Sequence, residues 1–105
     1  MLEEIPESDW NLVLALHDVA LARFCQAALE EAQGIGLDGS LTAPERFRKL
    51  HGFLREKDKD LAGIFGDSLR RSRAVVFLHM LQSWGLLRPA ELARFSPPTR
   101  ARLGG

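Results

Sequence analysis

The sequence lacks most of the features that secreted, β-rich or membrane-spanning proteins depend on. Its single cysteine, Cys25, excludes a disulfide within the chain, so we expect a reducing, cytosolic environment. Tyrosine is absent and β-branched residues are few, which disfavours β-sheet. The N-terminus has no basic start followed by an apolar run, so no signal peptide is expected. Residues 12–29 form the longest apolar region, but His17, Asp18 and Arg23 interrupt it, so we expect no contact with a membrane.

The residues that are abundant favour helices. Ala, Leu, Arg and Glu dominate a chain of 105 residues that is 46% hydrophobic and 27% charged. These values fit one globular domain. We therefore expect an all-α fold, a small bundle of four to five helices that occupies residues 1–105. Within it, residues 1–7 are expected to form a loose lead-in and residues 97–105 a weakly ordered C-terminal tail.

An apolar run from Ala74 to Leu78 predicts a buried central helix around which the other helices pack. This helix is expected to start at residue 67 or 68 and to place Phe77 and Trp84 in the core. Gly85 is expected to adopt a left-handed conformation and end the helix. Leu86 would then make the apolar contact that accompanies a Schellman ending.

A long N-terminal helix is predicted to begin after Ser8, as N-cap, and to run to about Gln33. Its apolar residues recur at spacings of three and four, and they form two neighbouring rows rather than one. Two rows are more than a single neighbouring helix can cover, so either two helices pack on this helix or one row contacts a second copy of the chain; we expect the second. The predicted homodimer interface consists of Trp10, Leu12, Leu16 and Val19.

A second long helix is predicted to start at Thr42, which forms a capping box with Glu45. Apolar residues follow at helical spacing, and Lys57 occupies the one position where another was due. The polar run around Lys57, together with two later glycines, predicts a break or kink near Asp58. After the central helix, Pro89 is expected to start a short helix that ends near Phe95.

Charge is distributed unevenly along the chain. Residues 1–44 carry eight acidic residues and one basic residue, whereas residues 45–105 carry six acidic and thirteen basic residues. The two halves either neutralise each other or leave the basic half for an anionic partner. Arg70, Arg71 and Arg73 lie at a predicted helix N-terminus, and Glu30 and Glu31 lie near a helix C-terminus. Because both clusters oppose their own helix dipoles, we predict that they pair with each other, within about 4 Å.

No pattern in the sequence indicates catalysis. The three histidines and Cys25 show no close ligand spacing, and there is no phosphate-binding loop, nucleophile elbow or paired-carboxylate motif. We therefore expect no catalytic residues, no cofactor and no metal site, and we predict that the protein is not an enzyme.

The predicted function is that of a non-enzymatic interaction module with a regulatory or scaffolding role in the cytosol. It would contact itself, as a homodimer, and another protein. The alternative is a DNA-binding transcriptional regulator, because residues 58–85 resemble a helix-turn-helix segment with arginines where phosphates are met. No β-hairpin wing is predicted after this segment. The candidate contacts for a protein partner or a nucleic acid are Arg70, Arg71, Arg73 and His79.

Overall fold

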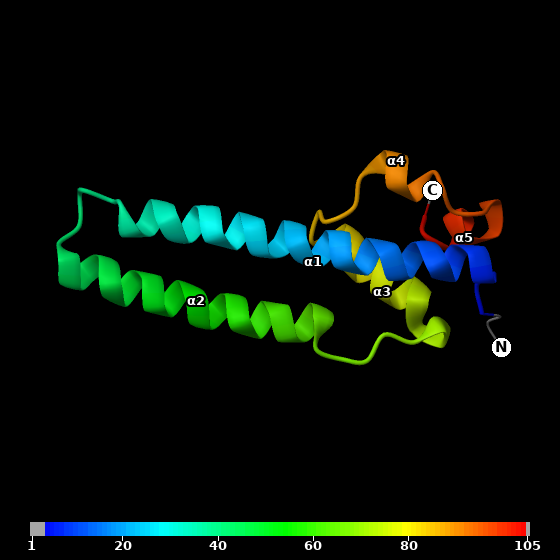
Figure 1. The fold of residues 1–105 in the computed structure, drawn as a ribbon, viewed down its shortest axis with the longest axis horizontal. Coiled ribbons are helices and arrows are strands. Elements are labelled where there is room, and N and C mark those ends of the chain that lie inside the picture. Colours follow the sequence, from blue (N-terminus) through cyan, green and yellow to red (C-terminus); the bar gives the residue numbers. More distant parts are fainter. Residues whose placement is uncertain (1–3, 105) are drawn as a thin grey trace.

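The computed structural model describes residues 4–104, and in this range all the regular secondary structure is helical, with no strand. The predicted all-α class and the long N-terminal helix are confirmed. α1 and α2 form a long antiparallel hairpin, and the later helices gather beside the N-terminal half of α1 (Figure 1). The elements are α1 (Glu7–Gly36), α2 (Ala43–Phe65), the 3₁₀ turn η1 (Arg71–Arg73), α3 (Ala74–Ser83), α4 (Pro89–Leu92) and α5 (Pro97–Arg102).

The molecule is elongated, with extents of 54 × 25 × 20 Å, because its two ends are built differently. At one end, which we call the base, α3, α4 and α5 cover α1. At the other, which we call the arm (residues 25–60), α1 and α2 project beyond the base as a pair of helices with nothing packed on either face (Figure 1). The arm is therefore a single layer of two helices, whereas stable helical domains bury their apolar stripes between layers.

Nearly all buried apolar side chains lie in the base. They form two clusters, and the partly buried Phe77 of α3 packs against both. The first cluster contains Ile5, Val13, Leu16, Ala74, Leu78, Phe95 and Leu103, and the second contains Ala20, Phe24, Ile64, Leu81 and Leu86. α2 contributes one buried residue, Ile64, close to its C-terminal end. The central position predicted for the apolar helix is thus correct, although Val76 and Trp84 are 51% and 42% exposed, so the core position predicted for Trp84 is wrong.

The ends of the helices follow their sequence signals in two places. Thr42 Oγ1 accepts a hydrogen bond from the Glu45 backbone N–H (3.3 Å), and Glu45 Oε1 accepts one from the Thr42 N–H (2.9 Å), which confirms the capping box. Gly85 has a φ of 69°, and the Leu86 N–H donates to the Leu81 carbonyl at 2.9 Å. This pattern confirms the Schellman ending of the central helix.

Two predicted helix boundaries are wrong. α2 is one continuous helix of 23 residues without a break near Asp58, because packing against α1 outweighs the weak propensity of its polar stretch. α3 starts at Ala74 rather than at residue 67 or 68, and the chain before it is extended at Arg70 (φ −126°, ψ 141°). There, Arg71 Nε donates to the Ile5 carbonyl at 2.9 Å, which fastens the connection to the chain that leads into α1.

The chain ends are better ordered than predicted. Ile5, expected in a loose lead-in, is 2% exposed within the core. Residues 97–105 were expected to be a weakly ordered tail, yet Pro97–Arg102 forms α5, with Thr99 buried. Residues 1–3 and 105 lie outside the described range. The predicted N-cap, Ser8, is already inside α1, whose N-cap is Pro6.

The carboxylate of Asp9, only 2% exposed, joins the two ends of the chain. It accepts hydrogen bonds from the Ser96 N–H (3.0 Å), the Ser96 hydroxyl (2.5 Å) and the Thr99 hydroxyl (2.6 Å). Burial acts to raise the pKa of Asp9, but these hydrogen bonds outweigh it and the pKa is lowered. Asp9 of α1 therefore anchors Ser96, the N-cap residue of α5, a contact between distant residues that a local reading of the sequence could not reveal.

Candidate functional site: an apolar face on the arm

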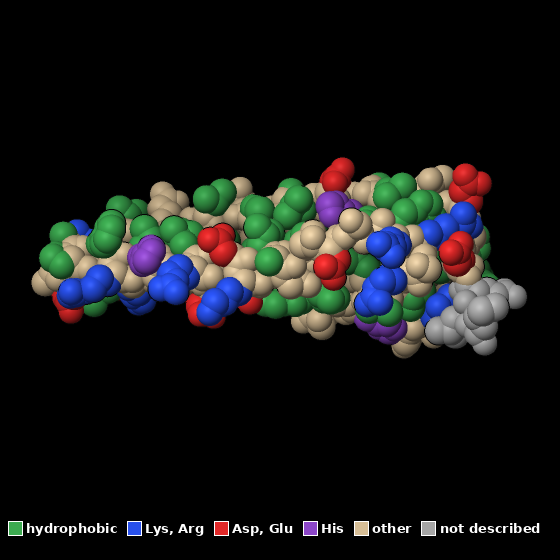
Figure 2. Space-filling model, turned by 90° about the horizontal axis from the view of Figure 1, so that it is seen from below, with side chains coloured by type: hydrophobic (Ala, Val, Ile, Leu, Met, Phe, Trp, Pro, Cys, Tyr) green, Lys and Arg blue, Asp and Glu red, His purple; other side chains and the backbone are tan. Residues whose placement is uncertain are grey.

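One face of the arm exposes Leu29, Phe47 and Leu54, and towards the base it continues into the partly buried Cys25 and Leu61; we call these five residues the apolar face. Phe47 is 74% exposed, Leu29 64% and Leu54 43%. Hydrophobic side chains gather along one edge of the arm in Figure 2, above a band that carries the charged residues of α2. Between the two helices this face is hollowed into a groove of about 200 Å³, lined by Phe24, Cys25, Ala28, Leu29, Leu54, Lys57, Asp58 and Leu61.

The spacing of apolar residues explains why this face is incompletely covered. In α2 the side chains at positions 47, 50, 54, 57, 61 and 64 alternate spacings of three and four, the heptad pattern of helices that pack on more than one neighbour. In α1 positions 25, 28, 32 and 35 follow the same pattern. Ile35 and Ile64 are buried, whereas Phe47 and Leu54 face outward. In α2 the hairpin therefore leaves one of the two heptad positions, that of Phe47 and Leu54, without a packing partner.

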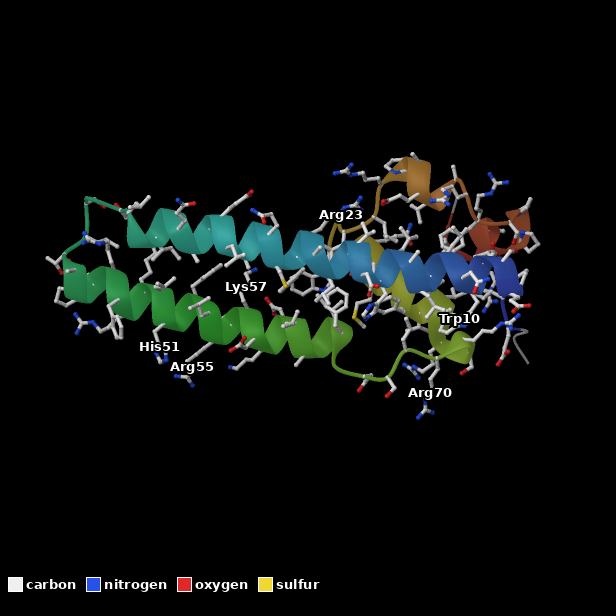
Figure 3. All side chains as sticks on the ribbon, viewed as in Figure 1. Trp10, Arg23, His51, Arg55, Lys57 and Arg70 are labelled. Carbon is white, nitrogen blue, oxygen red and sulfur yellow. The ribbon has the colours of Figure 1, made fainter. Side chains whose placement is uncertain are left out.

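Lys57 stands in the seam between the two helices of the arm (Figure 3). Its Nζ lies 5.7 Å from the centre of the Phe24 ring and 5.6 Å from that of Phe53, within the range of cation–π attraction. Asp60 Oδ2 is 3.8 Å away. The sequence carries the signal for this arrangement, because Lys57 occupies the one position of α2 where the pattern predicts another apolar residue. A single lysine at such a position sets the register of packed helices at some expense of stability.

The two helices of the arm carry opposite charge. Between Phe24 and Thr42 there are three acidic residues and no basic one, whereas residues 43–55 carry four basic residues and one acidic residue. Arg48, Lys49 and Arg55 are exposed, and no ion pair holds them within residues 4–104. His51 and Arg55 point away from α1 along the outer edge of α2 (Figure 3). The apolar face is therefore bordered by acidic and basic edges.

The predicted pairing between the arginine cluster and the acidic end of α1 is wrong. Arg71 lies beside the start of α1, where its Nε is 3.8 Å from Glu4 Oε2 and donates to the Ile5 carbonyl. Glu30 lies 25 residues further along the straight α1, which corresponds to about 38 Å. The clusters are kept apart because α1 is a continuous helix and α3 packs at its N-terminal half.

The other candidate contacts have separate surroundings. Arg70 and Arg73 are exposed, and Arg70 points away from the base in Figure 3. Both line a small hollow between the end of α2 and α3, together with His17 and Asp67. The exposed His79 lies elsewhere, with its Nε2 2.9 Å from the Arg102 carbonyl at the end of α5. The structure thus brings Arg70 and Arg73 together but not His79.

The residues predicted to form the dimer interface lie mostly in the core of the chain. Leu16 is 5% exposed, and Trp10 and Leu12 pack against the same cluster. Val19 alone of the four is exposed, at 39%. The premise that these residues form an uncovered row is wrong, because α3 and the C-terminal helices cover the N-terminal half of α1. The uncovered apolar surface lies further along, on the arm.

Sequence reasoning also missed the ion pair that fastens α4 to α1. Arg23 NH1 and NH2 donate to Glu91 Oε1 and Oε2, both at 2.7 Å, and NH1 also donates to the Leu86 carbonyl at 2.9 Å. The Arg88 N–H donates to Glu91 Oε1 at 2.8 Å. The hydrogen-bonded guanidinium of Arg23 lowers the pKa of Glu91 to about 2. Arg23 is the one basic residue among residues 1–44, and its structural role is to pair with Glu91.

Three further observations bear on the class of protein. Among residues 4–104, no three His, Cys, Asp or Glu side chains gather as they would around a metal ion. α1 is long and apolar enough to cross a membrane, with a mean hydropathy of 1.5, and 22% of this stretch is buried inside the protein. A central helix of a helical domain meets the same criteria of length and composition.

Compared with known proteins, the chain matches no family model, no curated protein and no solved structure.

Proposed function

We propose that this protein is a non-enzymatic interaction module, which acts in the cytosol by protein–protein contact through the apolar face of the arm. One observation carries the proposal: Leu29, Phe47 and Leu54 expose apolar surface on a two-helix layer that lacks a second layer. Single exposed apolar residues are ordinary, but here Leu29 and Leu54 line a groove and Phe47 extends the same face of α2 beyond it, and a contiguous apolar patch of this kind is typical of an interface. Such a module regulates or scaffolds by binding its partner, and this role requires no catalytic group.

The architecture supports a contact function in a second way. The base has its own core, fastened by the Asp9 and Arg23 contacts, and does not need the arm in order to bury its apolar residues. The arm projects from this base with few buried residues of its own. A rigid base that presents a helical surface suits recognition of a helical partner, whose apolar side chains would fill the groove beside Leu29 and Leu54.

Site-specific photo-crosslinking in cells tests the proposal. A photo-reactive phenylalanine analogue replaces Phe47 on the apolar face, and in a matched control it replaces Val76, which is also about half exposed but lies on α3. We expect protein adducts from position 47 that position 76 does not give. If position 47 gives no adducts, or if both positions give the same adducts, the proposed surface is wrong.

A second function, DNA binding through residues 58–85, is favoured by one observation: Arg70 and Arg73 are exposed, and neither forms an ion pair with a carboxylate of residues 4–104. Against it, five residues separate α2 from η1, and the arginines precede α3 instead of lying along it. The outward side of α3 presents Val76, and His79 is already bonded to α5. We therefore rank this function second.

Titration of duplex DNA of mixed sequence at two salt concentrations distinguishes the two functions. Binding that weakens steeply with salt, and that Arg70→Ala with Arg73→Ala abolishes, would favour DNA. Phe47→Glu is the matched variant for the apolar face, and it would leave such binding nearly unchanged. If neither titration shows binding, contact through the arm remains the better account.

A further inference from the structure

We propose that a second copy of this chain covers the apolar face, so that two arms pack together as an antiparallel four-helix bundle with α1 of each copy over α2 of the other. This inference rests on the proposed function, because it names the partner of that surface. It places the dimer contact on the arm, away from the N-terminal half of α1 where the sequence had suggested it.

The spacing of apolar residues favours an identical partner. Packed helices bury both positions of a heptad pattern, in two-stranded coiled coils as in four-helix bundles. The arm buries Ile35 and Ile64 and leaves Phe47 and Leu54 outside. The missing layer must supply two antiparallel helices with the same periodicity, and a second arm does so without any change in backbone.

The size of the surface also fits a dimer. The part of α2 that lies in the arm, residues 43–60, corresponds to a length of about 27 Å, and two helices side by side are about 20 Å wide. The resulting footprint is about 540 Å² per copy, close to the roughly 600 Å² per partner at the lower end of standard interfaces. Leu29, Phe47 and Leu54 belong to neither core cluster, and only Cys25 and Leu61, at the end of the face next to the base, pack against the second cluster.

Charge selects the partner and its orientation. The acidic side of the arm, between Phe24 and Thr42, carries an excess of three negative charges, and residues 43–55 carry an excess of three positive charges. A twofold axis parallel to the helices brings each acidic helix over the basic helix of the other copy. A twofold axis across the helices would stack the two acidic segments on each other. Repulsion between the two acidic segments disfavours this second arrangement.

In the favoured arrangement specific residues meet. Leu29 and Leu54 line the same groove, so Glu30 and Arg55 lie at the same level along the arm. Parallel twofold symmetry keeps this level, and Glu30 of one copy therefore comes close to Arg55 of the other. Arg55 has no ion-pair partner within the described part of the chain, and it points away from its own α1 (Figure 3). In the dimer, Glu30 of one copy and Arg55 of the other form one pair on each of the two edges of the bundle.

Sedimentation velocity of the full chain over a range of micromolar concentrations tests this inference. The parent is expected to sediment with twice the 11.7 kDa mass of one chain. Leu29→Glu and Phe47→Glu should each raise the dissociation constant roughly 100-fold, because twofold symmetry counts every substitution twice. Both residues are exposed in the single chain, so circular dichroism should show unchanged helix content. Val76→Glu is the matched control and should leave the dimer intact.

Exchange of charge tests the orientation. Arg55→Glu and Glu30→Arg should each weaken the dimer roughly three- to tenfold, and the double variant should restore it. Failure of the double variant to restore the dimer would overturn the proposed orientation.

A monomeric parent at every concentration would overturn the inference. So would a dimer that Val19→Glu dissociates and Leu29→Glu does not, because this result would place the contact on the first half of α1. The crosslinks from position 47 separate this failure from that of the proposed function. Adducts with other proteins alone, and none with a second copy, would overturn the dimer and leave the interaction module standing.

Discussion

The ion pair between Arg23 and Glu91 allows a quantitative prediction about stability. Replacing Glu91 with Gln removes the charge while keeping the size of the side chain. In the folded protein the pKa of Glu91 falls from 4.5 to about 2, a difference equivalent to about 3 kcal/mol in the free energy of unfolding. The carboxylate is only 18% exposed, so solvent screens the pair weakly. We expect Glu91→Gln to destabilise the protein by about 2–3 kcal/mol at neutral pH, because one hydrogen bond from Arg88 can remain.

The pH dependence of this effect has a definite sign. Because the folded-state pKa lies below the unfolded one, the stabilisation is complete above about pH 4.5 and is lost as the pH falls towards 2. The difference between parent and variant should therefore shrink over this range. Urea unfolding followed by circular dichroism at pH 7 and at pH 2.5 measures it, since about 2–3 kcal/mol moves the midpoint by roughly 1–2 M.

A matched control is available on the arm. Glu56 pairs with Lys59 at 3.6 Å, but both side chains are 71% exposed. Glu56→Gln should change the free energy of unfolding by less than about 0.5 kcal/mol. Equal effects of the two substitutions at neutral pH, or a Glu91→Gln effect that persists undiminished at acidic pH, would refute the argument that this ion pair holds α4 to α1.

Three further substitutions test other parts of the fold. Asp9→Asn should lower the free energy of unfolding by about 2–3 kcal/mol and expose the backbone amides of α5 to rapid hydrogen exchange. Unchanged exchange would contradict the anchoring of α5 by Asp9. Gly85→Ala should cost about 1 kcal/mol in thermal or urea unfolding because of its φ of 69°, and a neutral result would contradict the Schellman ending. Lys57→Leu should raise the free energy of unfolding by about 1 kcal/mol and make the register between α1 and α2 less specific. A lower free energy of unfolding would show that the contacts of the Lys57 ammonium group with Phe24 and Phe53 stabilise the chain.

Local patterns in the sequence predicted the features that depend on neighbouring residues. The capping box at Thr42, the ending at Gly85 and the long apolar helices each follow from a few adjacent positions. The errors arose where distant residues decide the outcome. Asp9 anchors Ser96, the N-cap residue of α5, 87 residues away, and Arg71 is held by the carbonyl of Ile5, so neither role is visible in its own segment.

The sequence placed the uncovered apolar surface on the wrong half of the first helix. Its two apolar rows allowed either two neighbouring helices or a second chain, and in the structure α2 and α3 both pack on α1. Which half of the helix they cover depends on where α3 and the C-terminal helices dock, and the periodicity of the sequence does not predict that. Trp10 and Leu16 were therefore assigned to an interface although the base buries Leu16 and packs against Trp10. The heptad pattern of α2, with Phe47 and Leu54 on one side, was the signal that could have located the surface on the arm.

The continuity of α1 between base and arm has a consequence for the motions of the protein. Backbone amides in the first half of α1 are protected by the core, whereas those near the Gly36 end depend on contacts with α2 alone. Local opening should therefore start at the tip and spread towards the base, and native-state hydrogen exchange should show a gradient of opening free energies along a single helix. A partner seated on the arm would flatten this gradient, so exchange rates in α1 would report occupancy of the distant surface without any change in average structure.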